Sequence, residues 1–176
     1  VEDEGRWVDA AGTDDVQERA RAVTVDGLRL LVGVTDSGVV YAVDDRCPHE
    51  GYPLAQGVLK DCVLTCAWHN WKFDVRDGQN ILGGEGIRSW PVRIVGDVVQ
   101  VDVTRPPPEL EVPRLLDSVR EGLFDGSEDR CLRDLVRLLE AGESTASLFV
   151  EIARDDAVRA EYGSTHTLPL CGDLLE

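Results

Sequence analysis

Over the first hundred residues, apolar and polar positions alternate in short runs that are rich in β-branched side chains. Such runs, separated by turn residues, are typical of β-strands. Asp26-Gly27 joins the runs at 19–25 and 28–34, and Gly96-Asp97 joins those at 89–95 and 98–103, so two hairpins are predicted. Further strands are predicted at 6–9, 39–43, 63–66 and 71–75. The pattern predicts a mainly β fold, a sandwich or a small barrel, for residues 1–104.

A proline run at Pro106-Pro107-Pro108 is followed by a change in the apolar period from two to about 3.6, which indicates helices. Because three prolines favour a stiff extended spacer, residues 105–108 are predicted to be a linker. Pro113 suits the first turn of one helix, and Ser144 suits the N-cap of another. The helices are predicted from four apolar groups: Leu115, Leu116, Val119 and Leu123; Leu132, Leu135, Val136, Leu138 and Leu139, stopped near Gly142; Leu148, Phe149 and Ile152; and Leu168, Leu170, Leu174 and Leu175. Residues 109–176 are therefore expected to form a helical extension or the start of a longer domain.

The charge of the chain limits its partners. Its 176 residues include 18 Lys and Arg against 34 Asp and Glu, a formal net charge of −16. Residues 1–104 hold 10 basic and 18 acidic side chains and residues 105–176 hold 8 and 16, so each part carries −8. This argues against nucleic acid and anionic membranes as partners. It suits a protein that meets a basic face on its partner, although the charge can equally serve solubility alone.

The candidate chemistry lies in two short motifs of alternating cysteine and histidine. Cys47 and His49 stand in Cys-Pro-His, Cys66 and His69 stand in Cys-Ala-Trp-His, and sixteen residues separate His49 from Cys66. Two cysteines and two histidines can hold a Rieske-type [2Fe–2S] cluster or a zinc ion. Zinc fingers usually place both cysteines before both histidines, so the alternating order favours the cluster. A degenerate, metal-free site is the third alternative.

These motifs resemble the Rieske [2Fe–2S] family, and within it the soluble ferredoxins that serve ring-hydroxylating oxygenases. The resemblance rests on Cys47, His49, Cys66, His69 and Trp71 and spans residues 7–103. It implies a Rieske-type β-sandwich with inserted cluster-binding loops, and a [2Fe–2S] cluster held by the four cysteine and histidine ligands. It also implies electron transfer from a reductase to an oxygenase-type acceptor, with the histidine-bound iron nearest the surface.

The chain departs from the family pattern near the motifs. Respiratory relatives join the two loops by a disulfide at positions that here hold Tyr52 and Trp68, so this chain lacks that clamp. Those relatives also have hydroxyl side chains at the positions of Trp71 and Phe73, which raise the reduction potential. The resemblance therefore implies a low potential, and it implies that Trp68 and Trp71 shield the cluster from water.

The backbone of the cluster loops also differs from the family. Asn70 stands where relatives usually have glycine, and asparagine tolerates the left-handed backbone that the turn needs. A loop at residues 83–89, expected to cover the cluster from a third side, has glycines where relatives have a proline.

Little else in the sequence suggests chemistry. His166 is the one histidine left after His49 and His69, so a separate mononuclear iron site with two histidines cannot be built, and no glycine-rich loop suggests a nucleotide cofactor. Trp7, Tyr41, Trp90 and Cys131 are interpreted as core residues. The chain is therefore expected to be a one-electron carrier that is not an enzyme on its own. The alternatives are the N-terminal Rieske domain of a longer oxidoreductase and a redox-sensing module that binds a partner.

The cysteine count and the hydropathy suggest the compartment. Five cysteines are an odd number, and Cys62, Cys131 and Cys171 are not predicted ligands. Unpaired thiols, with no apolar run of 18 residues and no leader-like start, predict a cytoplasmic protein without a membrane partner.

Overall fold

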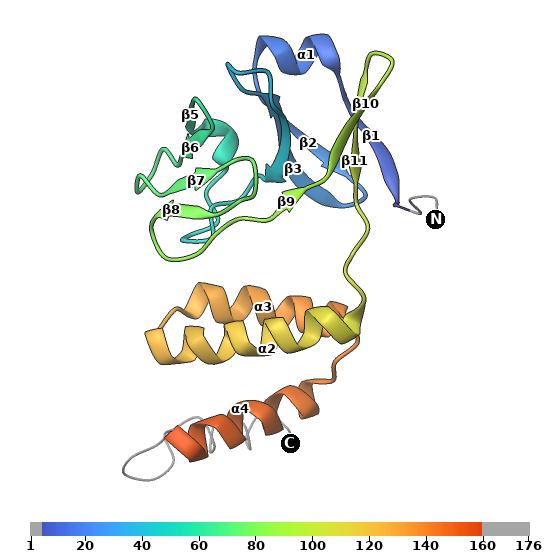
Figure 1. The fold of residues 1–176 in the computed structure, drawn as a ribbon. Helices are drawn as coiled ribbons and strands as arrows, with labels where there is room; N and C mark the ends of the chain where they lie inside the picture. The colour runs from blue at the N-terminus through green and yellow to red at the C-terminus, as the bar shows by residue number, and fades with distance from the viewer. Residues whose placement is uncertain (1–4, 160–176) are drawn as a thin grey trace. The chain divides into compact units, whose positions relative to one another are not determined.

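The structure, a computed structural model, describes residues 5–159 and divides the chain into two compact units (Figure 1). The first unit is Val1–Arg105 and the second is Pro106–Glu176. The first is built of β-strands and the second of helices, so the predicted mainly β fold with a helical extension is confirmed. None of the described helices is long and apolar enough to cross a bilayer.

The described residues of the first unit form three antiparallel sheets. Their strand orders are β1-β11-β10, β2-β3-β4-β9 and β5-β6-β7-β8. The strands are β1 (Trp7–Gly12), β2 (Arg21–Val25), β3 (Leu28–Val34), β4 (Val40–Asp44), β5 (Val58–Lys60), β6 (Val63–Thr65), β7 (Lys72–Asp74), β8 (Asn80–Leu82), β9 (Ser89–Trp90), β10 (Val92–Val95) and β11 (Val98–Asp102).

The two predicted hairpins are present. Val25 pairs with Leu28 across Asp26-Gly27, and both turn residues have positive φ, as a type I′ turn requires. Val95 pairs with Val98 across the second turn. The run at 89–95 is divided into β9 and β10 at Pro91, because proline has no N–H to donate to a ladder.

Sequence periodicity missed the shortest elements. The helix α1 (Thr13–Glu18) has six residues and buries one of them, Val16. A single apolar position cannot show the repeat of a helix. The strands β5 and β8 have three residues each and form the two edges of their sheet, and β8 includes exposed Ile81 and Leu82. Such short strands form because neighbouring strands pair with them, which a local pattern does not reveal.

Two apolar clusters form the core of this unit. One includes Cys47, Cys66, Tyr41 and Phe73, and the other includes Trp90. The prediction that Tyr41 and Trp90 are core residues is confirmed. Trp7 is only half-buried, and the guanidinium carbon of Arg93 lies 4.1 Å from the centre of its ring, so its expected core position is only partly correct.

The Tyr41 hydroxyl is buried and has no hydrogen-bond partner among residues 5–159, and burial raises the pKa of Tyr41 to about 12. An unsatisfied buried hydroxyl costs free energy, because it has lost its bonds to water. Tyr41→Phe is therefore expected to leave the free energy of unfolding unchanged or to raise it by about 1 kcal/mol. Urea unfolding followed by tryptophan fluorescence reports on this unit, since all four tryptophans lie in it. A loss of more than about 1 kcal/mol would show that the hydroxyl is satisfied by bound water.

The helical unit contains α2 (Pro108–Asp125), α3 (Glu128–Glu140) and α4 (Thr145–Arg159). Its core is formed by Leu115, Val119, Leu138 and Leu148. The Ser144 hydroxyl accepts a hydrogen bond from the Ser147 N–H at 3.0 Å, so the predicted cap is confirmed.

Parts of the helix prediction were wrong. The helix α2 begins at Pro108, because prolines fit a first helical turn, and this places Pro113 inside the helix. Leu123 does not continue the buried face, and 46% of its surface is exposed. Cys131 is buried, as expected, and its thiol contacts the Val119 carbonyl oxygen at 3.6 Å. The predicted fourth helix, with His166 and Cys171, lies outside the described residues.

Candidate metal centre

The first site loop, residues 45–53, connects β4 to the short 3-10 helix η1 (Leu54–Gln56) and carries Cys47 and His49. Two backbone hydrogen bonds close it: the Cys47 N–H donates to the Tyr52 carbonyl, and the Gly51 N–H donates to the Cys47 carbonyl, both at 2.8 Å. Gly51 has φ +70°, which suits glycine. The closure turns the loop back on itself and holds the cysteine at its base.

The second site loop, residues 66–71, connects β6 to β7 and repeats this closure. The Cys66 N–H donates to the Trp71 carbonyl at 2.8 Å, and the Asn70 N–H donates to the Cys66 carbonyl at 3.2 Å. Asn70 has φ +59° at the position equivalent to Gly51. The expectation that asparagine supports this turn is therefore confirmed.

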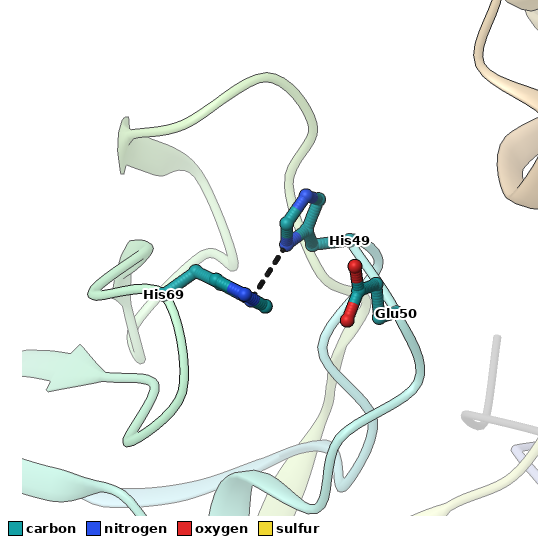
Figure 2. A group of neighbouring side chains, drawn as sticks. All are labelled: His49, Glu50 and His69. Atoms are coloured by element: carbon teal, nitrogen blue, oxygen red, sulfur yellow. Dashed lines mark hydrogen bonds between the residues drawn. The ribbon is translucent and has the colours of Figure 1, made fainter.

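The four predicted site residues come together in these two loops. Cys47 and Cys66 are 2% and 1% exposed and belong to the same apolar cluster. Burial, with a smaller effect of Cys66, raises the pKa of Cys47 to about 11, so without metal this thiol stays protonated. His49 is half-buried and His69 is exposed, with their Nδ1 atoms 3.0 Å apart (Figure 2). The thiols thus lie inside the protein and the imidazoles lie toward its surface.

Each of these histidines has an indole ring stacked against it. Trp71 lies 4.8 Å from His49, centre to centre and with 20° between the planes, and Trp68 lies 5.4 Å from His69 with 11°. The loop at residues 83–89 packs against Trp71. A side chain at Gly83 would collide with this indole, and a Cβ at Gly84 would lie 3.3 Å from it. Trp71 is half-buried, but Trp68 is 55% exposed, so Trp68 shields the site less than expected.

Sequence reasoning missed Asp45, which is completely buried two residues before Cys47. Its carboxylate accepts hydrogen bonds from the Arg29 Nε at 2.8 Å and from the Ala55 N–H at 2.6 Å. It therefore joins the first site loop to β3 on one side and to η1 on the other. An acidic residue directly after an apolar strand and before a metal-binding motif was the available signal.

The ligand atoms in the two site loops indicate which metal group the site can hold. His49, Glu50 and His69 place ligand atoms within 4.8 Å of one another, which is the donor set of a mononuclear iron site (Figure 2). The same two loops, however, also carry two buried thiols, Cys47 and Cys66. Two thiolates inside and two imidazoles outside fit a group with two metal ions of different ligation, which is the Rieske arrangement.

Comparison with known proteins agrees with this geometry. A family model described as "Rieske [2Fe-2S] domain" matches residues 6–87. The ferredoxin component of the alkene monooxygenase system of Xanthobacter autotrophicus is 31% identical over 112 residues, which are 62% of this chain and 92% of that protein. The chain belongs to the Rieske [2Fe–2S] family.

Two further proteins are similar to part of the chain. The ferredoxin component of the naphthalene 1,2-dioxygenase system of Pseudomonas aeruginosa is 29% identical over 102 residues, which are 56% of this chain and 97% of that protein. A crystal structure of dicamba monooxygenase with non-heme iron and dicamba superposes with a TM-score of 0.53 and 27% identity. That match covers 58% of this chain but only 34% of the monooxygenase chain.

The family membership establishes the cofactor and the class of function. The protein has the Rieske fold in its first unit and a Rieske-type [2Fe–2S] cluster as its cofactor. It is an electron carrier, as are the ferredoxin components that it resembles along nearly their whole length. The zinc site and the metal-free site considered from the sequence are not favoured.

Proposed function

We propose that this Rieske protein takes one electron at a time from a reductase and passes it to an oxygenase-type acceptor. Cys47 and Cys66 would hold one iron, and His49 and His69 would hold the other. When bound, the cluster supplies a reversible one-electron redox centre. The observation that carries the proposal is the difference in exposure across the site, with two buried thiols behind two outward-lying imidazoles.

This difference indicates where redox partners approach. A partner that docks against the first unit at the site loops meets the exposed His69 and the half-buried His49, because the thiols are covered. The stacked indoles restrict how both rings can turn, so the rings keep a constant orientation toward a partner.

The charge of the unit favours partners with a basic docking face. Residues 1–104 carry a formal charge of −8, and Glu50 lies exposed beside the two histidines. Opposite charges accelerate encounter, and the effect weakens as salt screens it. Cys62 and Cys131, the two described cysteines outside the proposed ligand set, are free thiols, which supports the further proposal that the protein works in the reducing cytoplasm.

The reduction potential tests this function. Hydrogen bonds to cluster or thiolate sulfurs stabilise the reduced state, and Phe73, fully buried in the same core as both thiols, offers none. We expect a midpoint in the low part of the Rieske range, which spans roughly −150 to +300 mV. Protein-film voltammetry of the intact chain at pH 7 measures it, and a midpoint above about +150 mV would exclude a donor of this kind.

The variant Phe73→Tyr should raise the midpoint, because it adds a hydroxyl donor inside this core. Phe73→Leu is the matched control: it alters the ring without supplying a donor, so it should not reproduce the increase. An equal shift in both variants would assign the effect to packing instead of hydrogen bonding.

A further inference from the structure

The two site loops belong to different sheets, and their relative position decides whether all four predicted ligands can meet. The first loop leaves β4, in the β2-β3-β4-β9 sheet, and the second connects β6 to β7, in the β5-β6-β7-β8 sheet. Each loop is closed by its own backbone hydrogen bonds, but these bonds do not join one loop to the other.

Several side-chain contacts cross between the loops, and most use a predicted ligand. Cys47 contacts Cys66, and His49 contacts both His69 and Trp71. Tyr52 and Trp68 also meet, with ring centres 4.8 Å apart and planes at 77°, and neither residue is a predicted ligand. This edge-to-face geometry is favourable between aromatic rings.

Both aromatic residues are fixed to their own loops. The Tyr52 hydroxyl donates to the Gln56 Oε1 at 2.7 Å, and the Tyr52 carbonyl accepts the hydrogen bond that closes the first loop. Trp68 stacks on the ring of His69 with 11° between the planes. A continuous series of contacts therefore runs from η1 through Tyr52 and Trp68 to His69.

We propose that Tyr52 and Trp68 are positioning residues, which form a non-covalent bridge between the two loops and hold His69 in place for the cluster. This inference rests on the proposed ligands. The bridge leaves all four ligand side chains available to metal. Tyr52 is partly buried and packs against the apolar cluster around the thiols, whereas Trp68 is 55% exposed and adds little to that core, so the contribution of Trp68 lies in the geometry of the loops.

The test is a double-mutant cycle on the full-length holoprotein with Tyr52→Ala, Trp68→Ala and the double variant. The rate of cluster loss to an iron chelator is followed by visible absorption, and unfolding in urea is measured in parallel. Each single variant is expected to lose its cluster about threefold to tenfold faster than the unmodified protein, as expected for one aromatic pair. The double variant should be no faster than the faster single variant, because both changes remove the same contact.

Conservative variants separate positioning from general packing. Trp68→Phe keeps an aromatic edge-to-face partner and should restore slow cluster loss. Tyr52→Phe keeps the ring but removes its bond to Gln56, so it should give an intermediate rate. The bridge would be overturned if the two single increases in the rate of cluster loss multiplied in the double variant, or if all variants lost the cluster at the wild-type rate. An unmodified protein without the EPR signal of a histidine-ligated cluster would instead overturn the proposed ligands.

Discussion

Replacing Cys66 by serine is expected to abolish the [2Fe–2S] cluster. Cys66 is 1% exposed, its thiol contacts that of Cys47, and its backbone closes the second site loop. Serine has a similar size and keeps the backbone bonds, but its hydroxyl is a much weaker ligand for iron than a thiolate. Iron and sulfide should fall from about two of each per chain to nearly none, and the rhombic EPR signal of the reduced protein should disappear.

Cys62→Ser is the matched control for this experiment. Cys62 is a free, half-buried thiol that packs against the same apolar cluster, but it stands outside both site loops. The control should keep full iron content and an unchanged EPR signal. A Cys66→Ser protein that retains a histidine-ligated cluster, or a Cys62→Ser protein that loses it, would contradict the proposed ligand set.

Replacing Asp45 by alanine is expected to lower the free energy of unfolding of the first unit by about 2–3 kcal/mol. The carboxylate is fully buried, and its loss leaves the Ala55 N–H without its acceptor and the Arg29 guanidinium without its partner. The first site loop then loses both side-chain bonds that hold it to β3 and η1 and keeps only the backbone bond from the N–H of residue 45 to the Arg29 carbonyl, so cluster loss should accelerate together with unfolding. Urea unfolding followed by tryptophan fluorescence and cluster absorption measures both effects.

Arg29→Ala separates the two roles of this carboxylate. The Arg29 side chain is 50% exposed, so its ion pair is partly screened by water and should contribute only about 1 kcal/mol. Asp45→Asn keeps an acceptor oxygen for Ala55 and should fall between the two alanine variants. If Asp45→Ala costs no more than Arg29→Ala, then the hydrogen bond to Ala55 does not hold the loop.

Local patterns predicted the elements whose physical causes are local. The Asp26-Gly27 turn forms because its residues tolerate positive φ, and Ser144 caps α4 through a bond three residues along the chain. The start of α2 and the strands β5 and β8 were not predictable in this way. Several prolines in series leave the first helical turn ambiguous, and a three-residue strand depends on its neighbours.

The sequence by itself predicted the ligand chemistry of this protein, because residue type and order favour a Rieske-type cluster over a zinc ion at Cys47, His49, Cys66 and His69. It also determined that Tyr52 and Trp68 cannot form a disulfide between the loops. Only the tertiary structure decided that these two rings meet, that the thiols are buried while the imidazoles lie outward, and that Asp45 holds the base of the first loop. These features depend on contacts between segments far apart in the chain, such as Arg29 with Asp45 and Tyr52 with Trp68, and no local pattern encodes such contacts.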